Sequence, residues 1–143
     1  MKHWWKILTV MILLYVLTIG MLAPLAPGIT SVSPEKAMTG KILTMQVNGY
    51  NSNFTKSKEI IRAWLELDTM NALCAESIKI IDDTQLELTF SIPSSLPSQK
   101  MIESATLIVN NDVDGSSIFP DAIFIKQDTT LSETSSEEWT SCA

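Results

Sequence analysis

The pattern of apolar and polar residues changes once along the chain, near residue 28. Residues 7–26 form an unbroken run of about 20 apolar or neutral residues, the length that a helix needs to cross the hydrocarbon core of a bilayer. After Pro27 and Gly28, which disfavour helix, apolar and polar residues alternate instead. The chain therefore divides into a predicted transmembrane anchor (1–28), a predicted β domain (29–126) and a tail (127–143).

Two lysines and two tryptophans flank the start of the apolar run. Lys2 and Lys6 lie on its N-terminal side, with Trp4 and Trp5 between them. Lys is enriched on the cytoplasmic side of membrane helices, and Trp at the headgroup level. This pattern predicts a single-pass anchor in a bacterial inner membrane, with the N-terminus in the cytoplasm and the following domain in the periplasm. A cleavable signal peptide is the alternative. It is disfavoured because a proline follows each alanine at which cleavage could occur.

Four stretches of the exported part alternate with a period of two, and each predicts a strand with one buried face. The apolar positions are Leu43, Met45 and Val47; Leu86, Leu88, Phe90 and Ile92; Ala105, Leu107 and Val109; and Ile123 and Ile125. Residues 60–68 are predicted as a further strand rather than a short helix. Turn-forming residues stand at 33–34, 48–49, 82–83, 93–97 and 114–115. Six or seven short strands in about 100 residues indicate an all-β, antiparallel β-sandwich.

Three segments of the predicted β domain follow one another in a recognisable order: 28–34 (GITSVSP), 40–54 (GKILTMQVNGYNSNF) and 83–93 (DTQLELTFSIP). They resemble the opening strand, the second strand with its corner, and the D-T-x-L strand of the TIG or IPT family of immunoglobulin-like modules. The chain departs from that pattern at Gly49-Tyr50, where a clear G-x-N-F corner is expected, and it lacks a glycine-rich closing hairpin. The resemblance implies an immunoglobulin-like β-sandwich that serves as a binding or spacer module.

The N-terminus carries a second, shorter resemblance. Residues 3–8 (HWWKIL), 13–15 (LLY) and 21–24 (MLAP) are similar to the first span of the haem-transport permeases of cytochrome c assembly. The further spans and the tryptophan-rich haem region of that family are not found in these 143 residues. The similarity implies the N-terminal part of such a permease, with a membrane-protein or cytochrome c assembly partner. A free-standing surface protein with a structural or adhesive role, binding glycan or protein, is the alternative.

The charge of the chain argues against a nucleic-acid partner. Two of its 10 Lys and Arg lie in residues 1–28, which leaves eight basic against 16 acidic residues in the rest, a formal charge of -8. Phosphate backbones would repel such a surface, so membrane lipid and protein remain the expected partners. Residues 127–143 hold four acidic and no basic residues among many Ser and Thr, and are predicted to be an acidic, flexible tail.

Catalytic chemistry is not expected. Cys–His and Ser–His–Asp mechanisms need a histidine base. The one histidine is His3, on the cytoplasmic side of the predicted anchor. Cys74, in an apolar stretch, and Cys142, in the tail, are expected to be unpaired thiols, with a disulfide between them as the alternative. The chain is therefore predicted to be a non-enzyme without a cofactor.

Two candidate binding features remain. The first resembles a calcium loop, with oxygen-bearing side chains at suitable spacing, and comprises Asn110, Asp112, Asp114 and Asp121. An Asn/Asp/Gly β-hairpin explains the same residues more simply, so no metal site is predicted. The second is Trp64, which is the candidate partner-contact residue because exposed aromatic side chains anchor partners. The alternative places Trp64 in the core.

Overall fold

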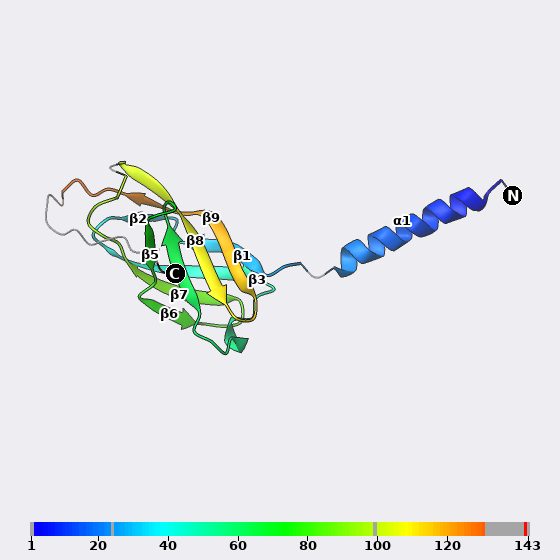
Figure 1. Cartoon of the computed structure of the whole chain (residues 1–143), viewed down its shortest axis with the longest axis horizontal. Coiled ribbons are helices and arrows are strands. Elements are labelled where there is room, and N and C mark those ends of the chain that lie inside the picture. Colours follow the sequence, from blue (N-terminus) through cyan, green and yellow to red (C-terminus); the bar gives the residue numbers. More distant parts are fainter. Residues whose placement is uncertain (1, 24, 99, 131–141, 143) are drawn as a thin grey trace.

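The computed structural model describes residues 2–23, 25–98, 100–130 and 142. An N-terminal helix stands apart from a domain built of β-strands (Figure 1). The elements are α1 (Trp4–Leu22), β1 (Gly28–Ser33), β2 (Lys36–Met38), β3 (Ile42–Tyr50), the 3-10 helix η1 (Phe54–Lys56), β4 (Arg62–Glu66), β5 (Ala72–Cys74), β6 (Ser77–Ile80), β7 (Gln85–Ser91), β8 (Ile102–Asn111) and β9 (Gly115–Lys126).

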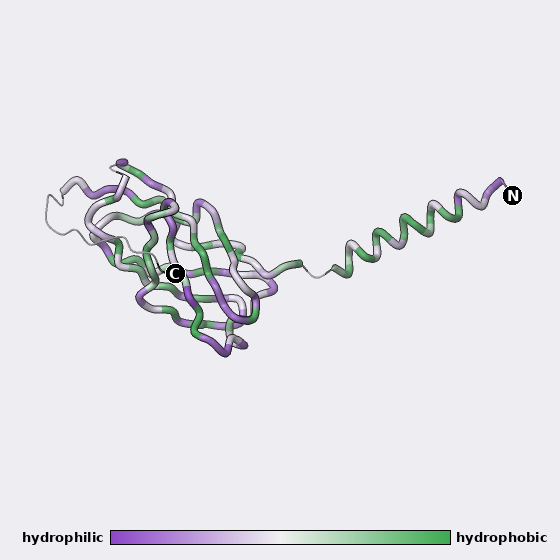
Figure 2. Tube along the Cα trace, in the orientation of Figure 1, coloured by the Kyte–Doolittle hydropathy of each residue, from purple (hydrophilic) through white to green (hydrophobic). Residues whose placement is uncertain are grey.

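The helix α1 is long and apolar enough to cross a membrane or to serve as a signal sequence. Its 19 residues span roughly 28 Å, close to the thickness of a bilayer core. None of its side chains is buried, and apolar residues occur along its whole length (Figure 2). The hydroxyl of Thr9 donates to the Trp5 carbonyl and that of Thr18 to the Leu14 carbonyl. The helix thus satisfies these polar groups internally, as an apolar solvent requires.

The β domain consists of two sheets. The four-stranded sheet has the order β1-β3-β7-β6, and the five-stranded sheet, which is curled, has the order β2-β9-β8-β4-β5. Every pair is antiparallel except β2 with β9. The chain changes from one sheet to the other between β1 and β2, at the cis peptide bond Ser33–Pro34. One hydrophobic core takes side chains from both sheets.

The alternation of the sequence correctly predicts the principal strands. All of the apolar positions named above are buried in the core, on β3, β7, β8 and β9 or, for Ile92, directly after β7. Residues 60–68 contain a strand, β4, as expected. The mostly β architecture behind one apolar N-terminal helix is confirmed.

One predicted turn, at Asn48-Gly49, is wrong. Gly49 lies within β3 and pairs with Ile29 of β1, and the chain turns only at Asn51, whose φ is 52°. Glycine is needed here for space, because a Cβ atom on Gly49 would lie 2.5 Å from the hydroxyl oxygen of Ser52. Of the other four predicted turns, 82–83 and 93–97 fall between strands, while 33–34 begins at the last residue of β1 and 114–115 ends at the first residue of β9.

Candidate functional site

The two sheets present different side chains to solvent. Between Ile42 and Tyr50, which stand at the two ends of β3, the outward positions of β3 and β7 are all polar: Thr44, Gln46, Asn48, Gln85, Glu87, Thr89 and Ser91. The outward positions of β4, β8 and β9 include five large apolar side chains, which we call the outer apolar face: Trp64, Ile102, Ile108, Ile118 and Phe124. A sheet face that meets only water is normally polar. Ser104 and Thr106 of β8 separate Ile102 and Phe124 from the other three residues. Contiguous exposed apolar side chains mark a surface that binds a partner.

Three residues of the outer apolar face form a row across the sheet. Trp64 on β4 lies opposite Ile108 on β8, and Ile108 lies opposite Ile118 on β9. Directly opposed residues of antiparallel strands have Cβ atoms about 5 Å apart, so these side chains are within contact range. Ile118 is 63% exposed although it belongs to a regular strand pair. The row therefore gives a continuous apolar strip across three strands.

Trp64 lies on the outside of the domain. Its neighbours Ala63 and Leu65 are buried, whereas Arg62 and Glu66 share its side of β4. The alternation of the strand thus turns the indole away from the core, where it stays half-buried among surface neighbours. The alternative that placed Trp64 in the core is wrong, and its role as a contact residue stays a prediction.

A disulfide bond joins Cys74 to Cys142 directly beside Trp64. The two Cα atoms are 5.6 Å apart, and Cys74 on β5 lies opposite Trp64 on β4. The expectation of two unpaired thiols is therefore wrong. Cys74 is exposed on an edge strand rather than enclosed by its apolar sequence neighbours, so another cysteine can reach it. Cys142 lines hollows of about 360 Å³ and 270 Å³ that both include Trp64.

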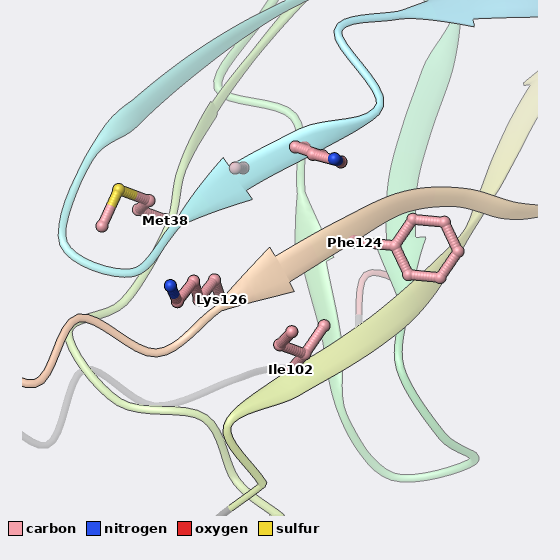
Figure 3. Close-up of a pocket in the computed structure, with 6 residues that line it drawn as sticks. Met38, Ile102, Phe124 and Lys126 are labelled. Carbon is pink, nitrogen blue, oxygen red and sulfur yellow. The ribbon is translucent and has the colours of Figure 1, made fainter.

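A groove of about 530 Å³ crosses the opposite edge of the same sheet (Figure 3). It is lined by Lys36, Ala37 and Met38 of β2, Ile102 of β8, and Phe124 and Lys126 of β9. In the sheet register Lys36 is next to Phe124, and Lys126 lies between Met38 and Ile102. Cations therefore alternate with apolar side chains. This arrangement suits a partner that offers apolar groups together with carboxylates.

One carboxylate lies near the lysines at this edge. A hydrogen bond from the Thr130 hydroxyl (2.6 Å) is the main cause that lowers the pKa of Asp128, followed by the Thr130 N–H (3.0 Å). Lys41 and Lys126 lower the pKa of Asp128 further by charge attraction. Asp128 thus stays ionised and offsets part of the positive charge. Lys36, which is exposed, approaches the groove from the side of β2.

The four calcium candidates do not lie together. Asn110 is within β8 and pairs with Ser116, while Asp121 is in β9, six residues beyond Gly115. Six residues of extended strand correspond to roughly 20 Å, so Asp121 is far from the hairpin turn. No cluster of three or more His, Cys, Asp or Glu side chains able to hold a metal occurs in the part of the chain that the structure describes.

The two hairpin aspartates instead bind protein donors. Asp114 accepts from the Asn53 N–H at 2.8 Å. Asp112 accepts from the Ser57 hydroxyl and from the Lys58 N–H at 3.2 Å. The bond from Ser57 is the main cause that lowers the pKa of Asp112. Both carboxylates therefore join the β8–β9 hairpin to the loop before β4.

Comparison with models of protein families, with curated proteins and with solved structures gave no match. The site must therefore be interpreted from its own geometry. Neither the groove at β2 nor the row Trp64–Ile108–Ile118 is predicted from the sequence. A signal was present in the sequence, because Ile108 interrupts the alternation between Leu107 and Val109, and Phe124 does so between Ile123 and Ile125.

Proposed function

We propose that this protein is a membrane-anchored, extracytoplasmic binding module, without catalytic activity, that recognises a protein partner through the outer apolar face. The observation that carries the proposal is the contrast between this face and the polar face of the other sheet in the same domain. Three isoleucines accompany the two aromatic residues, and aliphatic side chains favour a protein surface over a carbohydrate. Aromatic anchors such as Trp64 dominate the energetics of such contacts.

The strand order supports an immunoglobulin-like module. The sheets β1-β3-β7-β6 and β2-β9-β8-β4-β5 correspond to the strand orders A-B-E-D and A′-G-F-C-C′ of immunoglobulin-like sandwiches. The three segments that resemble TIG or IPT modules become β1, β3 with η1, and β7, with the three strands adjacent in one sheet. Immunoglobulin-like modules present one sheet or its loops to a partner, which agrees with the proposed binding role.

The disulfide supports an exported location. Disulfide bonds persist in oxidising compartments such as the bacterial periplasm and are rare in the cytosol. Lys2 and Lys6 precede α1, which favours a cytoplasmic N-terminus and a periplasmic β domain. Both arguments support an exported β domain on the periplasmic side of an inner membrane. The link to cytochrome c assembly rests on the N-terminal resemblance alone. Identification of the partner protein would test it.

The test is site-specific photo-cross-linking in membranes that carry the full chain. A photoreactive residue at Glu66, beside Trp64 on the outward side of β4, is expected to give a defined cross-link to one partner protein. The same residue at Thr89, on the polar face, gives none. Ile118→Ser and Trp64→Ala should each abolish the cross-link from Glu66.

Ile42→Ser is the matched control, because Ile42 is a similarly exposed isoleucine (72%) on the other sheet. It should leave the cross-link intact. Equal cross-linking from both faces, or insensitivity to Ile118→Ser, refutes the proposed face. Binding to glycans that is lost on Trp64→Ala supports the adhesive alternative instead.

A further inference from the structure

The connection between α1 and the β domain is short. The helix ends at Leu22 and β1 begins at Gly28. The side-chain amide of Asn51 donates to the carbonyl oxygen of Leu25 at 2.9 Å, so the connection is already held by the domain at that point. Three residue steps separate Leu22 from Leu25, which is at most about 11 Å of extended chain. The end of the domain that holds Asn51 therefore stays close to the end of α1.

The loops around Asn51 form one hydrogen-bonded surface, which we call the helix-proximal rim (residues 50–60, 82–84 and 111–114). It lies at the end of the domain that faces α1 (Figure 1). Three backbone N–H groups join its loops: those of Asn53, Phe54 and Lys58, which donate to the Asp114 carboxylate (2.8 Å), the Asp83 carbonyl (3.1 Å) and the Asp112 carboxylate (3.2 Å). Because these hydrogen bonds join the loops, the loops stay together as one surface.

Apolar side chains project from this rim into solvent. Ile60 is 89% exposed, Val113 at the tip of the β8–β9 hairpin is 47% exposed, and Tyr50 is 42% exposed. Lys56 and Lys58 are exposed on the same loop as Ile60. The rim also carries five carboxylates (Glu59, Asp82, Asp83, Asp112 and Asp114), so its attraction to a bilayer would be apolar rather than electrostatic. A tyrosine and aliphatic tips on one surface are typical of proteins that dip into the headgroup region of a bilayer.

We propose that the helix-proximal rim is a second membrane contact, in which Ile60 and Val113 enter the interfacial layer of the bilayer that α1 spans. Tyr50 would lie at the headgroup level, and Lys58 would reach a lipid phosphate, whereas Lys56 donates to the side-chain oxygen of Asn53 at 2.8 Å. The headgroup layer is about 5–8 Å thick on each side of the core, which is within the reach of the tether. The inference rests on the proposed membrane anchoring by α1. Its consequence is a β domain held in one orientation on the membrane.

The test uses the full chain, labelled with carbon-13 at its isoleucine methyl groups, in phosphatidylcholine and phosphatidylglycerol nanodiscs. A fraction of the lipid carries a nitroxide on its headgroup, which broadens the signals of nearby methyl groups. Ile60 is expected to lose most of its signal. Ile42, which is also highly exposed, should keep its signal, because it begins the strand that Tyr50 ends, roughly 26 Å away.

The isoleucines of α1 distinguish failure of the rim contact from failure of the proposed membrane anchoring by α1. Broadening of Ile7 and Ile19 shows that α1 is in the bilayer, whatever the rim does. If Ile7 and Ile19 broaden but Ile60 does not, the rim contact is refuted and the anchor stands. If none of the three broadens, the proposed anchoring is wrong and the rim contact falls with it.

A double variant tests the same contact without the nitroxide. Ile60→Ser with Val113→Ser should release the domain from the bilayer, so that methyl signals of the domain such as Ile118 become sharper through faster tumbling. Ile42→Ser is the control and should not change them. Unchanged line widths in the double variant would contradict the proposal.

Discussion

Replacement of either cysteine by serine is expected to lower the free energy of unfolding of the β domain by about 4 kcal/mol. The bond between Cys74 and Cys142 closes a loop with a sequence separation of 68. Chain entropy alone gives about 3 kcal/mol for a 15-residue loop and about 4.7 kcal/mol for one of 100 residues. A separation of 68 lies toward the upper end of that range, which sets the expected loss.

The pattern among the variants tests the reasoning better than one value does. Cys74→Ser, Cys142→Ser and the double variant each open the same loop, so all three should lose the same amount. Reduced wild-type protein should match them. A loss that doubles in the double variant would mean that each cysteine acts through its own packing, and the loop argument would fail.

The assay is urea unfolding of the oxidised full chain in detergent micelles, followed by near-ultraviolet circular dichroism. Stability must be compared as the free energy extrapolated to water, because opening the loop expands the unfolded chain and steepens the denaturant dependence. Mass spectrometry after thiol alkylation establishes the state of each sample. A loss of less than about 1 kcal/mol for Cys142→Ser would refute the predicted magnitude.

Three further predictions concern the core, a buried hydroxyl and pH. Phe90→Ala should lower the free energy of unfolding by about 3–5 kcal/mol in the same assay, because Phe90 is fully buried. Ser52→Ala should leave the free energy of unfolding unchanged or raise it by up to about 1 kcal/mol, because the buried Ser52 hydroxyl has no hydrogen-bond partner among the described residues. Gly49→Ala should lower the free energy of unfolding, because the added Cβ would clash with the Ser52 hydroxyl. The bond from Ser57 lowers the folded pKa of Asp112. The ionised Asp112 carboxylate therefore contributes its full stabilisation above the unfolded pKa of about 3.9, and this stabilisation is lost as the pH falls through the folded pKa. Asp112→Asn should remove this part of the pH dependence of stability, measured by acid titration of the folded protein.

The sequence predicts the long strands because their pattern and their burial have the same cause. Met45 belongs to the buried alternate positions of β3, and Phe90 to those of β7. A strand that covers a core buries every second side chain. The apolar helix is equally evident, since an uninterrupted apolar run of this length is long enough to span a membrane or to serve as a signal sequence. These features depend on neighbours within one element, which a single sequence displays.

Features that depend on distant segments escape the sequence. The short strands β2 and β5 have three residues each, too few to show a period, and they exist because β9 and β4 pair with them. The disulfide depends on bringing residue 142 back to β5, which no local pattern encodes. Trp64 illustrates an intermediate case. In the sequence, Trp64 shares the parity of the charged Arg62, which favours an outward position. Only the fold shows that Ile108 and Ile118 lie in the same row as Trp64.

The proposed anchor, the proposed rim contact and the outer apolar face would together restrict the kind of partner that the β domain meets. With the rim against the bilayer, the β8–β9 hairpin would lie at the membrane, and the outer apolar face on these strands would stay near the membrane surface. A partner held in the same membrane meets that face at a high effective concentration, which raises the occupancy of an interface of modest affinity. A soluble partner has no such advantage. The geometry therefore favours a neighbouring membrane protein as the partner, and cross-links from Glu66 should lead to proteins that stay in the membrane fraction after alkaline extraction.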